Sequence, residues 1–265
     1  MEKRPKIGIL YICTGKYVIF WREFFQSMEE NFLPEIEKHY FVFTDSSEID
    51  FAGKVDRIHV IHQDNLGWPD NTLKRFHVFL NQEESLSKMD YLFFCNANLQ
   101  VLQKISAKEF LPENNERLVA VQHPGFFNKV RDKFTYDNNS RSTAYIASTE
   151  GEIYVAGGLN GGYTSDFLQA MKVMKQNIDQ DLQKGIVALW HDESHWNRYI
   201  IGRSDVKILD AAYLYPEGWN IPFEKKILIR DKVNYGGHDF LRNQSPSLLS
   251  QLKIIIKKFI KSLYI

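Results

Sequence analysis

Short apolar segments alternate with amphipathic ones in the first part of the chain, and this alternation constrains the fold more than any other feature. Four apolar runs rich in β-branched and aromatic residues predict strands: 7–13, 40–44, 57–62 and 91–95. Between them, 20–32 and 71–86 carry apolar residues every three to four positions, which is typical of helices. Such alternation favours an α/β fold in which a mostly parallel central sheet is flanked by helices. Ligands bind such sheets at the carboxyl ends of the strands, where Cys13 and Asn96 lie.

The second half of the chain has a less regular pattern. A glycine-rich stretch at 157–162 precedes two segments with helical periodicity, 164–183 and 193–201. The segment 232–245 contains two adjacent glycines and few apolar residues, which indicates a mobile surface arm. Since no internal repeat is present and the length suits one large core, we expect residues 1–245 to form a single domain.

Charge and cysteine content exclude several classes of protein. The 33 basic and 33 acidic side chains cancel, so no overall field attracts nucleic acid, and an anionic ligand needs a local site. Cys13 and Cys95 lie in predicted buried strands, which indicates two reduced core thiols and no disulfide framework. The charged N-terminus leads into an apolar run too short for a signal peptide or membrane span. We therefore expect a cytoplasmic protein.

The last segment, 246–265, predicts a basic amphipathic helix. Apolar residues recur at helical spacing from Leu252 to Leu263, with lysines beside them. Such a helix either makes peripheral contact with a membrane surface through 252–265 or docks on the body of the protein. The pattern fits both alternatives.

Polar and ionisable residues are concentrated in the segment 190–197, Trp-His-Asp-Glu-Ser-His-Trp-Asn. His191 and His195 stand four residues apart, as zinc ligands on one face of a helix do. However, an aspartate rather than a glutamate follows His191, and no third ligand is evident. The simpler interpretation is a polar helix start capped by Asp192 or Ser194.

The chain resembles the family-six glycosyltransferases, which include the histo-blood-group A and B transferases and the α1,3-galactosyltransferases. The most specific motif is Trp-His-Asp-Glu-Ser-His at 190–195. Other matching segments follow in order along the chain: 41–45, 90–98, 123–126, 134–136, 144–146, 150–152, 161–162 and 241–243. The resemblance implies a glycosyltransferase-A-type fold with a Rossmann-like half that binds a nucleotide sugar. It also implies a retaining reaction and a divalent metal held by an Asp-x-Asp motif.

Asn96 and Asn98 stand where the resemblance places the two metal-binding aspartates. Neutral amides hold a divalent cation far less well than carboxylates do. We therefore expect no metal site and no cofactor. Either the amides contact the donor's hydroxyls or phosphate, or they close the turn after the strand.

Without a metal, cationic side chains must compensate the negative charge that develops on the departing UDP. Arg75 and Arg242 match family arginines near the donor, and Lys232 is a candidate because Gly236 occupies the place of the family's arm lysine. A charge pair at about 4 Å is worth on the order of 4 kcal/mol at an effective dielectric constant near 20. The alternative for each residue is an ordinary solvated charge.

Glu193 is the predicted catalytic residue, because the resemblance places it at the anomeric face of the donor sugar. Retention needs a carboxylate there, as a nucleophile or as the stabiliser of an ion pair. Asp192 matches an aspartate that binds the donor sugar's hydroxyls. Trp190 and His191 match residues that line the acceptor and donor sites, and we expect them to bind the acceptor.

Two glycines are expected to decide which donor sugar fits. Gly158 stands where A-type enzymes have glycine, which leaves room for the acetamido group of N-acetylgalactosamine (GalNAc). Gly157 beside it is either part of this donor site or a glycine required by a turn. For the nucleoside, Cys13 and Thr14 match backbone positions that contact the uridine, and Tyr17 matches a ring nearby.

Four further residues are expected to bind the acceptor. His123 and Thr135 match residues that bind galactose, and Ala156 leaves space for fucose. Pro216 replaces an expected aspartate, so the neighbouring Glu217 is the candidate substitute.

These residues together predict a retaining α1,3-N-acetylgalactosaminyltransferase. It would transfer GalNAc from UDP-GalNAc to the galactose of a fucosylated acceptor, Fucα1,2Gal, without a metal. The alternatives are an α1,3-galactosyltransferase that uses UDP-galactose, a non-catalytic carbohydrate-binding protein and, from the histidine pair, a zinc hydrolase.

Overall fold

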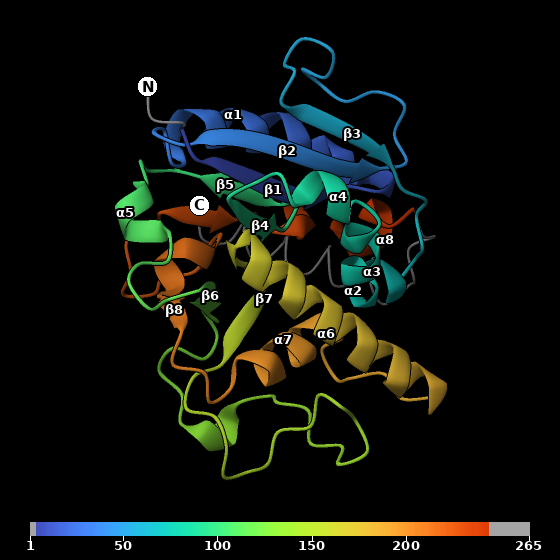
Figure 1. Ribbon diagram of the computed structural model, residues 1–265, viewed down its shortest axis with the longest axis vertical. Coiled ribbons are helices and arrows are strands. Elements are labelled where there is room, and N and C mark those ends of the chain that lie inside the picture. The colour runs from blue at the N-terminus through green and yellow to red at the C-terminus, as the bar shows by residue number, and fades with distance from the viewer. Residues whose placement is uncertain (1–3, 244–265) are drawn as a thin grey trace, which may run out of the picture.

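A computed structural model describes residues 4–243 of the chain, and residues 1–3 and 244–265 lie outside the described part (Figure 1). A seven-stranded sheet forms the centre of the molecule. Its strands, in spatial order, are β3 (Ile58–His62), β2 (Glu37–Thr44), β1 (Lys6–Ile12), β4 (Tyr91–Cys95), β7 (Val155–Tyr163), β6 (Leu118–Gln122) and β8 (Val206–Leu209).

Most neighbouring strands of this sheet are parallel. Only β7 runs against its neighbours, because it pairs antiparallel with both β4 and β6. The pairs β1 with β2, β2 with β3, β1 with β4 and β6 with β8 are all parallel. This arrangement confirms the predicted α/β fold with a mostly parallel central sheet.

Helices cover both faces of the sheet. Ile9 and Tyr11 of β1 point to the face that α1 (Trp21–Asn31) covers, while Leu10 points to the other face. That second face is covered by α3 (Arg75–Leu80), α6 (Thr164–Gln183) and α7 (Asp192–Ile200), whose buried residues belong to the same core (Figure 1).

Shorter elements complete the described part. They are η1 (Gly15–Phe20), α2 (Asp70–Leu73), α4 (Glu83–Leu86), β5 (Leu99–Val101), α5 (Ala107–Phe110), η2 (Arg131–Lys133), η3 (Ala211–Leu214), β9 (Tyr215–Pro216), β10 (Ile227–Ile229), η4 (Lys232–Tyr235) and α8 (Gly237–Leu241). Strands β5, β10 and β9 form a second, three-stranded sheet. The long connection between β6 and β7 consists mainly of loops and extends below the sheet in the view of Figure 1.

The glycine-rich stretch 157–162 belongs to β7, although the sequence pattern looked irregular there. Gly161 is required by a close approach, since a Cβ atom at this position would lie 2.2 Å from the carbonyl oxygen of Leu92. A Cβ at Gly162 would lie 2.3 Å from the carbonyl oxygen of Arg117. The glycines therefore let β7 pass closely between β4 and β6.

The single helix expected over 71–86 is divided into three short helices, α2, α3 and α4. The apolar periodicity continues across the breaks, because Leu73, Phe76 and Phe79 are all buried. For this reason the pattern did not reveal the breaks.

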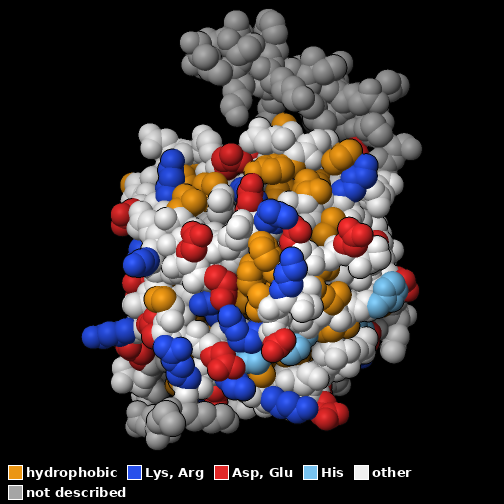
Figure 2. Space-filling view, turned by 90° about the horizontal axis from the view of Figure 1, so that it is seen from above, with side chains coloured by type: hydrophobic (Ala, Val, Ile, Leu, Met, Phe, Trp, Pro, Cys, Tyr) orange, Lys and Arg blue, Asp and Glu red, His pale blue; other side chains and the backbone are white. Residues whose placement is uncertain are grey.

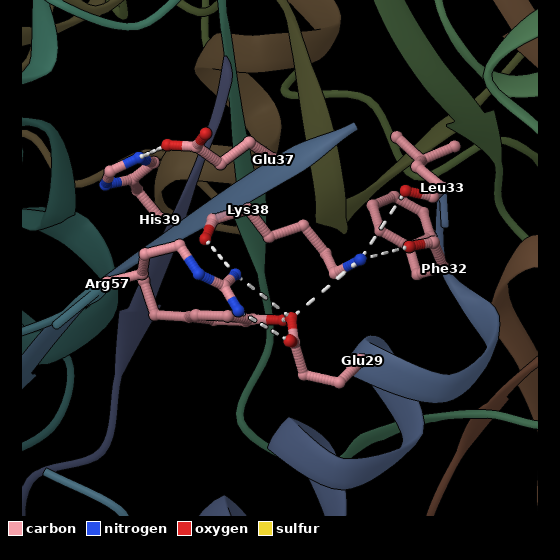
Figure 3. A network of polar contacts seen from close by, with 8 residues as sticks. Glu29, Phe32, Leu33, Glu37, Lys38, His39 and Arg57 are labelled. Atoms are coloured by element: carbon pink, nitrogen blue, oxygen red, sulfur yellow. Dashed lines mark hydrogen bonds and ion pairs between the residues drawn. The ribbon is translucent and has the colours of Figure 1, made fainter. Parts of the chain in front are cut away.

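A buried lysine joins the end of α1 to the edge of the sheet (Figure 3). The ammonium group of Lys38 donates a hydrogen bond to the Phe32 carbonyl at 2.9 Å and lies 3.8 Å from the Glu29 carboxylate. Arg57 of the loop before β3 reaches the same carboxylate, with its Nη2 at 2.9 Å from Oε2. Burial lowers the pKa of Lys38, and Glu29 opposes that shift. The network anchors α1 to β2 and β3 through charge-assisted hydrogen bonds.

The two cysteines are buried as expected, and the charges on the surface are mixed in sign. Cys13 and Cys95 are buried and free, and burial raises the pKa of the Cys13 thiol to about 12. Basic and acidic side chains are interspersed on the face seen in Figure 2.

The terminal regions correspond only in part to what was expected. Residues 232–243 of the predicted arm form η4 and α8, and Leu241 is fully buried in the core. The predicted helix 246–265 and its membrane contact at 252–265 lie outside the described residues. Within residues 4–243, no helix is both long enough and apolar enough to cross a membrane.

Candidate active site

A pocket lies at the carboxyl ends of β1 and β4, where the parallel sheet predicts a ligand site. Its walls come from the loop after β1, the segment 67–75, the turn after β4 and the arm. The lining residues are Ile12, Thr14, Tyr17, Gly67, Trp68, Asn71, Thr72, Arg75, Phe94, Asn96, Ala97, Asn98, Lys232 and Arg242. Seven of the predicted donor-binding residues are thus brought together from four separate parts of the chain.

Arg75 is almost completely buried on the inner wall of this pocket. Its Nε lies 3.0 Å from the carboxylate of Asp192, and its Nη1 donates a hydrogen bond to the Gly157 carbonyl at 2.9 Å. Burial raises the pKa of Asp192 to about 7, whereas the positive charge of Arg75 opposes that rise. The pair therefore ties α3, which begins at Arg75, to both β7 and α7.

Lys232 and Arg242 come from the arm and face the same pocket. The Lys232 ammonium lies 5.2 Å from the ring centroid of Tyr17, and the Arg242 guanidinium lies 4.0 Å from that of Trp68. Such cation–π contacts hold long cationic side chains in place. Burial lowers the pKa of Lys232 to about 8, and Arg242 and Arg75 contribute through repulsion. The pocket thus concentrates positive charge, which favours a bound anion.

The two asparagines form the turn between β4 and β5. Asn98 is buried, and its side-chain amide donates to the Arg230 carbonyl at 2.7 Å. The Asn96 backbone N–H donates to the Gly158 carbonyl, and the Asn96 side chain lies beside Gly158. Both residues also line the pocket. Asn96 and Asn98 can therefore both close the turn and face the ligand site.

Glu193 lies in the first turn of α7, next to β7. Its Oε1 accepts a hydrogen bond from the Tyr154 hydroxyl at 2.8 Å, and its Oε2 accepts one from the Gly157 backbone N–H at 2.7 Å. Hydrogen bonds of this kind stabilise an ionised carboxylate. His191, which precedes α7, has φ of 55°, an uncommon conformation for a residue other than glycine. Backbone strain of this kind is often found at functional sites.

The predicted acceptor residues His123 and Thr135 lie close to Glu193. Thr135 lies beside the Tyr154 hydroxyl and lowers its pKa, and the ring of His123 contacts that of Tyr154 with 5.7 Å between centroids. Burial lowers the pKa of His123, and the negative charge of Glu193 opposes the shift. Ala156 is buried next to Gly157 on β7. The structure therefore joins the catalytic candidate to part of the predicted acceptor site.

Two aromatic residues of the predicted acceptor site lie at the entrance to α7. Trp190 is 47% exposed, and the His191 ring packs against Trp68 of the pocket wall with 4.7 Å between centroids. The loop before α7 therefore links the pocket to the surface around Glu193.

Two other predicted residues have different surroundings. Cys13 is fully buried, its backbone N–H donates to the Phe43 carbonyl, and its carbonyl accepts from Thr44. The carboxylate of Glu217 accepts hydrogen bonds from the Asp231 backbone N–H at 2.6 Å and from Asn234. Glu217 thus supports the segment that carries Lys232, and the nucleoside and acceptor roles of Cys13 and Glu217 stay predictions.

The histidine pair has a structural explanation. His195 is buried and lies 4.0 Å from Asp181, and burial lowers its pKa to about 4. The N-cap of α7 is His191, which makes no side-chain capping hydrogen bond, so the expected cap at Asp192 or Ser194 was wrong. The hydroxyl of Ser194, inside the first turn, accepts a hydrogen bond from the Trp190 backbone N–H at 2.9 Å. Within residues 4–243, no three His, Cys, Asp or Glu side chains form a group able to hold a metal ion. The geometry therefore supports a helix start rather than a zinc site.

Sequence reasoning missed the residue that holds Glu193 and several residues of the pocket wall. Tyr154 belongs to the short apolar stretch 153–156, which is typical of a core, and it is indeed 1% exposed. Trp68, Asn71 and Thr72 lie directly before Arg75, so their position next to a family arginine was the one available signal.

Comparison with known proteins agrees with this geometry. The model of glycosyltransferase family 6 matches residues 2–243. The chain belongs to this family. It is 35% identical over 226 residues to the O-antigen biosynthesis glycosyltransferase WbnI of Escherichia coli, an alignment that covers 85% of this chain and 94% of that protein.

Animal members of the family are also similar to this glycosyltransferase. The histo-blood group ABO system transferase 1 of Rattus norvegicus is 28% identical over 246 residues, 89% of this chain and 68% of that protein. The globoside alpha-1,3-N-acetylgalactosaminyltransferase 1 of Gallus gallus is 29% identical over 219 residues, 80% of this chain and 62% of that protein.

Proposed function

We propose that this family-six enzyme is a retaining α1,3-N-acetylgalactosaminyltransferase that needs no divalent metal. It transfers GalNAc from UDP-GalNAc to the galactose of Fucα1,2Gal acceptors. One observation carries the proposal: the cationic pocket with Lys232 and Arg242 adjoins a carboxylate, Glu193, that two hydrogen bonds hold beside Gly157. Arg75 connects the two parts, because it lines the pocket and bonds to Gly157.

The cations support metal independence. When the glycosidic bond breaks, the diphosphate of UDP gains negative charge, and groups fixed in advance stabilise that charge most effectively. Lys232 and Arg242 are held over the aromatic rings of Tyr17 and Trp68. Each charge is worth on the order of 4 kcal/mol at about 4 Å and an effective dielectric constant near 20. Two such side chains can supply what a metal ion would supply to an Asp-x-Asp site.

Glu193 supports retention. A carboxylate at the anomeric carbon either forms a covalent sugar intermediate or stabilises an oxocarbenium-like ion pair, and both routes keep the configuration. The hydrogen bonds from Tyr154 and Gly157 fix the carboxylate and favour its ionised form. Both routes need that negative charge.

The names of the relatives and the surroundings of Gly158 support GalNAc as the donor sugar. Two of the similar animal proteins carry the name of an N-acetylgalactosaminyltransferase or of an ABO system transferase. At Gly158 a Cβ atom would lie 2.9 Å from the side-chain nitrogen of Asn96. The missing side chain therefore lets the amide of Asn96, which lines the pocket, pack directly against Gly158.

Gly158→Ala should move donor preference from UDP-GalNAc toward UDP-galactose. The added methyl group narrows the space for the acetamido group and presses on Asn96, whereas galactose has a hydroxyl there. One methyl-sized clash changes discrimination by about 10- to 200-fold. The ratio of kcat/KM for UDP-GalNAc to kcat/KM for UDP-galactose is measured on one preparation. Because misfolded enzyme lowers both values equally, the ratio does not depend on the folded fraction. An unchanged ratio would contradict the assignment of Gly158.

The acceptor is tested with a panel of donors and acceptors. UDP-GalNAc and UDP-galactose are each combined with 2′-fucosyllactose and with lactose, and the products are identified by mass spectrometry. We expect product formation mainly with UDP-GalNAc and 2′-fucosyllactose. Faster transfer from UDP-galactose would instead favour the α1,3-galactosyltransferase alternative.

A further inference from the structure

Both oxygens of the Glu193 carboxylate are occupied by protein donors, and one of these donors is a side chain. The Gly157 donor is a backbone N–H, so the Tyr154 hydroxyl is the one of the two donors that belongs to a side chain. Tyr154 directly precedes β7, and Glu193 lies on α7, 39 positions later in the chain. The contact is therefore a product of the tertiary fold and not of local sequence.

Tyr154 is fixed by its surroundings. It is 1% exposed, and its ring packs against Phe126, Phe134 and Tyr136 with 4.7, 6.0 and 5.1 Å between centroids. Burial and the neighbouring Glu193 carboxylate strongly raise the pKa of the phenol. The hydroxyl is thus a permanent donor at neutral pH, directed at one acceptor atom.

The same hydroxyl also contacts the acceptor side of the site. Thr135, which we expect to bind galactose, lies beside the Tyr154 phenol and lowers its pKa. In this arrangement, one phenol joins a residue of the acceptor site to the carboxylate of the donor site.

We propose that Tyr154 is the positioning residue of Glu193: its hydroxyl holds the carboxylate at the donor and connects it to Thr135. This inference rests on the proposed role of Glu193. A second contact holds β7 to α7 independently of Tyr154. The Asn197 side chain accepts a hydrogen bond from the Val155 N–H and donates one to the Val155 carbonyl. Removing the Tyr154 hydroxyl alone therefore leaves the attachment of β7 to α7 in place.

The test compares Tyr154→Phe with Tyr136→Phe. Tyr136 is a matched control because it belongs to the same aromatic cluster, but its hydroxyl donates to the Ile153 carbonyl at 2.7 Å instead of to Glu193. Two rates are measured for each enzyme: transfer to the acceptor, and hydrolysis of the nucleotide sugar without acceptor. The donor is whichever nucleotide sugar the wild type hydrolyses fastest, so an error in the sugar assignment does not affect the comparison.

We expect Tyr154→Phe to lower kcat for both reactions by about 10- to 100-fold, because a hydrogen bond to a charged group is lost. The donor KM should change little. Tyr136→Phe should change neither kcat nor the donor KM by more than about twofold.

Coupling to Thr135 is measured with a double-mutant cycle. If Thr135 acts on Glu193 through the phenol, Thr135→Val should slow hydrolysis less in the Tyr154→Phe background than in the wild type.

Two results would overturn the inference while leaving the proposed function intact. One is equal behaviour of the Tyr154→Phe and Tyr136→Phe enzymes. The other is a loss of transfer without a loss of hydrolysis, which would make Tyr154 an acceptor-binding residue. Failure of the proposed function would look different, because Glu193→Gln would then leave the wild-type rates unchanged.

Discussion

Glu193→Gln should reduce transfer about a thousandfold or more while the protein stays folded. The amide removes the negative charge that either retaining route needs at the anomeric carbon. It also turns an NH2 group, which cannot accept a hydrogen bond, toward one of the two donors, the Tyr154 hydroxyl or the Gly157 N–H. Initial rates of UDP release at saturating donor and acceptor measure the effect.

The control for this variant is Glu84→Gln. Glu84 lies on α4 with its side chain 94% exposed, so the same chemical change should have no effect on the rate there. Thermal unfolding of both variants separates a catalytic loss from a folding defect. A Glu193→Gln enzyme that keeps wild-type activity would exclude both proposed roles of the carboxylate.

Lys232→Met should lower kcat/KM for the nucleotide sugar by about 100-fold, since one of the positive charges facing the diphosphate is lost. The estimate lies below the value of about 4 kcal/mol for one close charge pair, because Lys232 is only half-buried. Lys54→Met, at an exposed position, should leave kcat/KM unchanged.

The same lysine predicts a pH dependence of UDP binding. Its pKa is lowered to about 8, so the charge is present at pH 7 and is lost as the pH rises through 8. UDP should therefore bind about tenfold more weakly at pH 9 than at pH 7, as calorimetry can measure. Lys232→Arg should remove this dependence, because arginine stays protonated. Equal affinity of the wild type at both pH values would contradict a role for Lys232 in binding the diphosphate.

The sequence pattern predicted those strands and helices in which apolar, buried residues recur at regular spacing. Strands β1 to β4 and helices α1, α6 and α7 all lie close to the expected ranges. The pattern failed where packing overrides periodicity. The glycines of β7 fit between two neighbouring backbones, and the buried ammonium group of Lys38 is compensated by Glu29 and by the carbonyl of Phe32, the C-cap of α1. Neither feature depends on local sequence.

Most of the candidate site came from the family resemblance rather than from residue spacing. Lys232 is the exception, because it was chosen to replace a missing charge, and the structure places it in the pocket with Arg75 and Arg242. Tyr154 was missed because its hydrogen bond to Glu193 spans 39 positions. An aromatic residue among other aromatics looks like ordinary core until the direction of its hydroxyl is known.

Transfer without a metal tests the central claim most directly. The purified enzyme is treated with EDTA and then given UDP-GalNAc and 2′-fucosyllactose, and product is followed with and without added manganese. We predict formation of the GalNAc-containing tetrasaccharide at the same rate in both conditions. No product in EDTA, with activity restored by manganese, would show that Lys232 and Arg242 do not replace the metal ion.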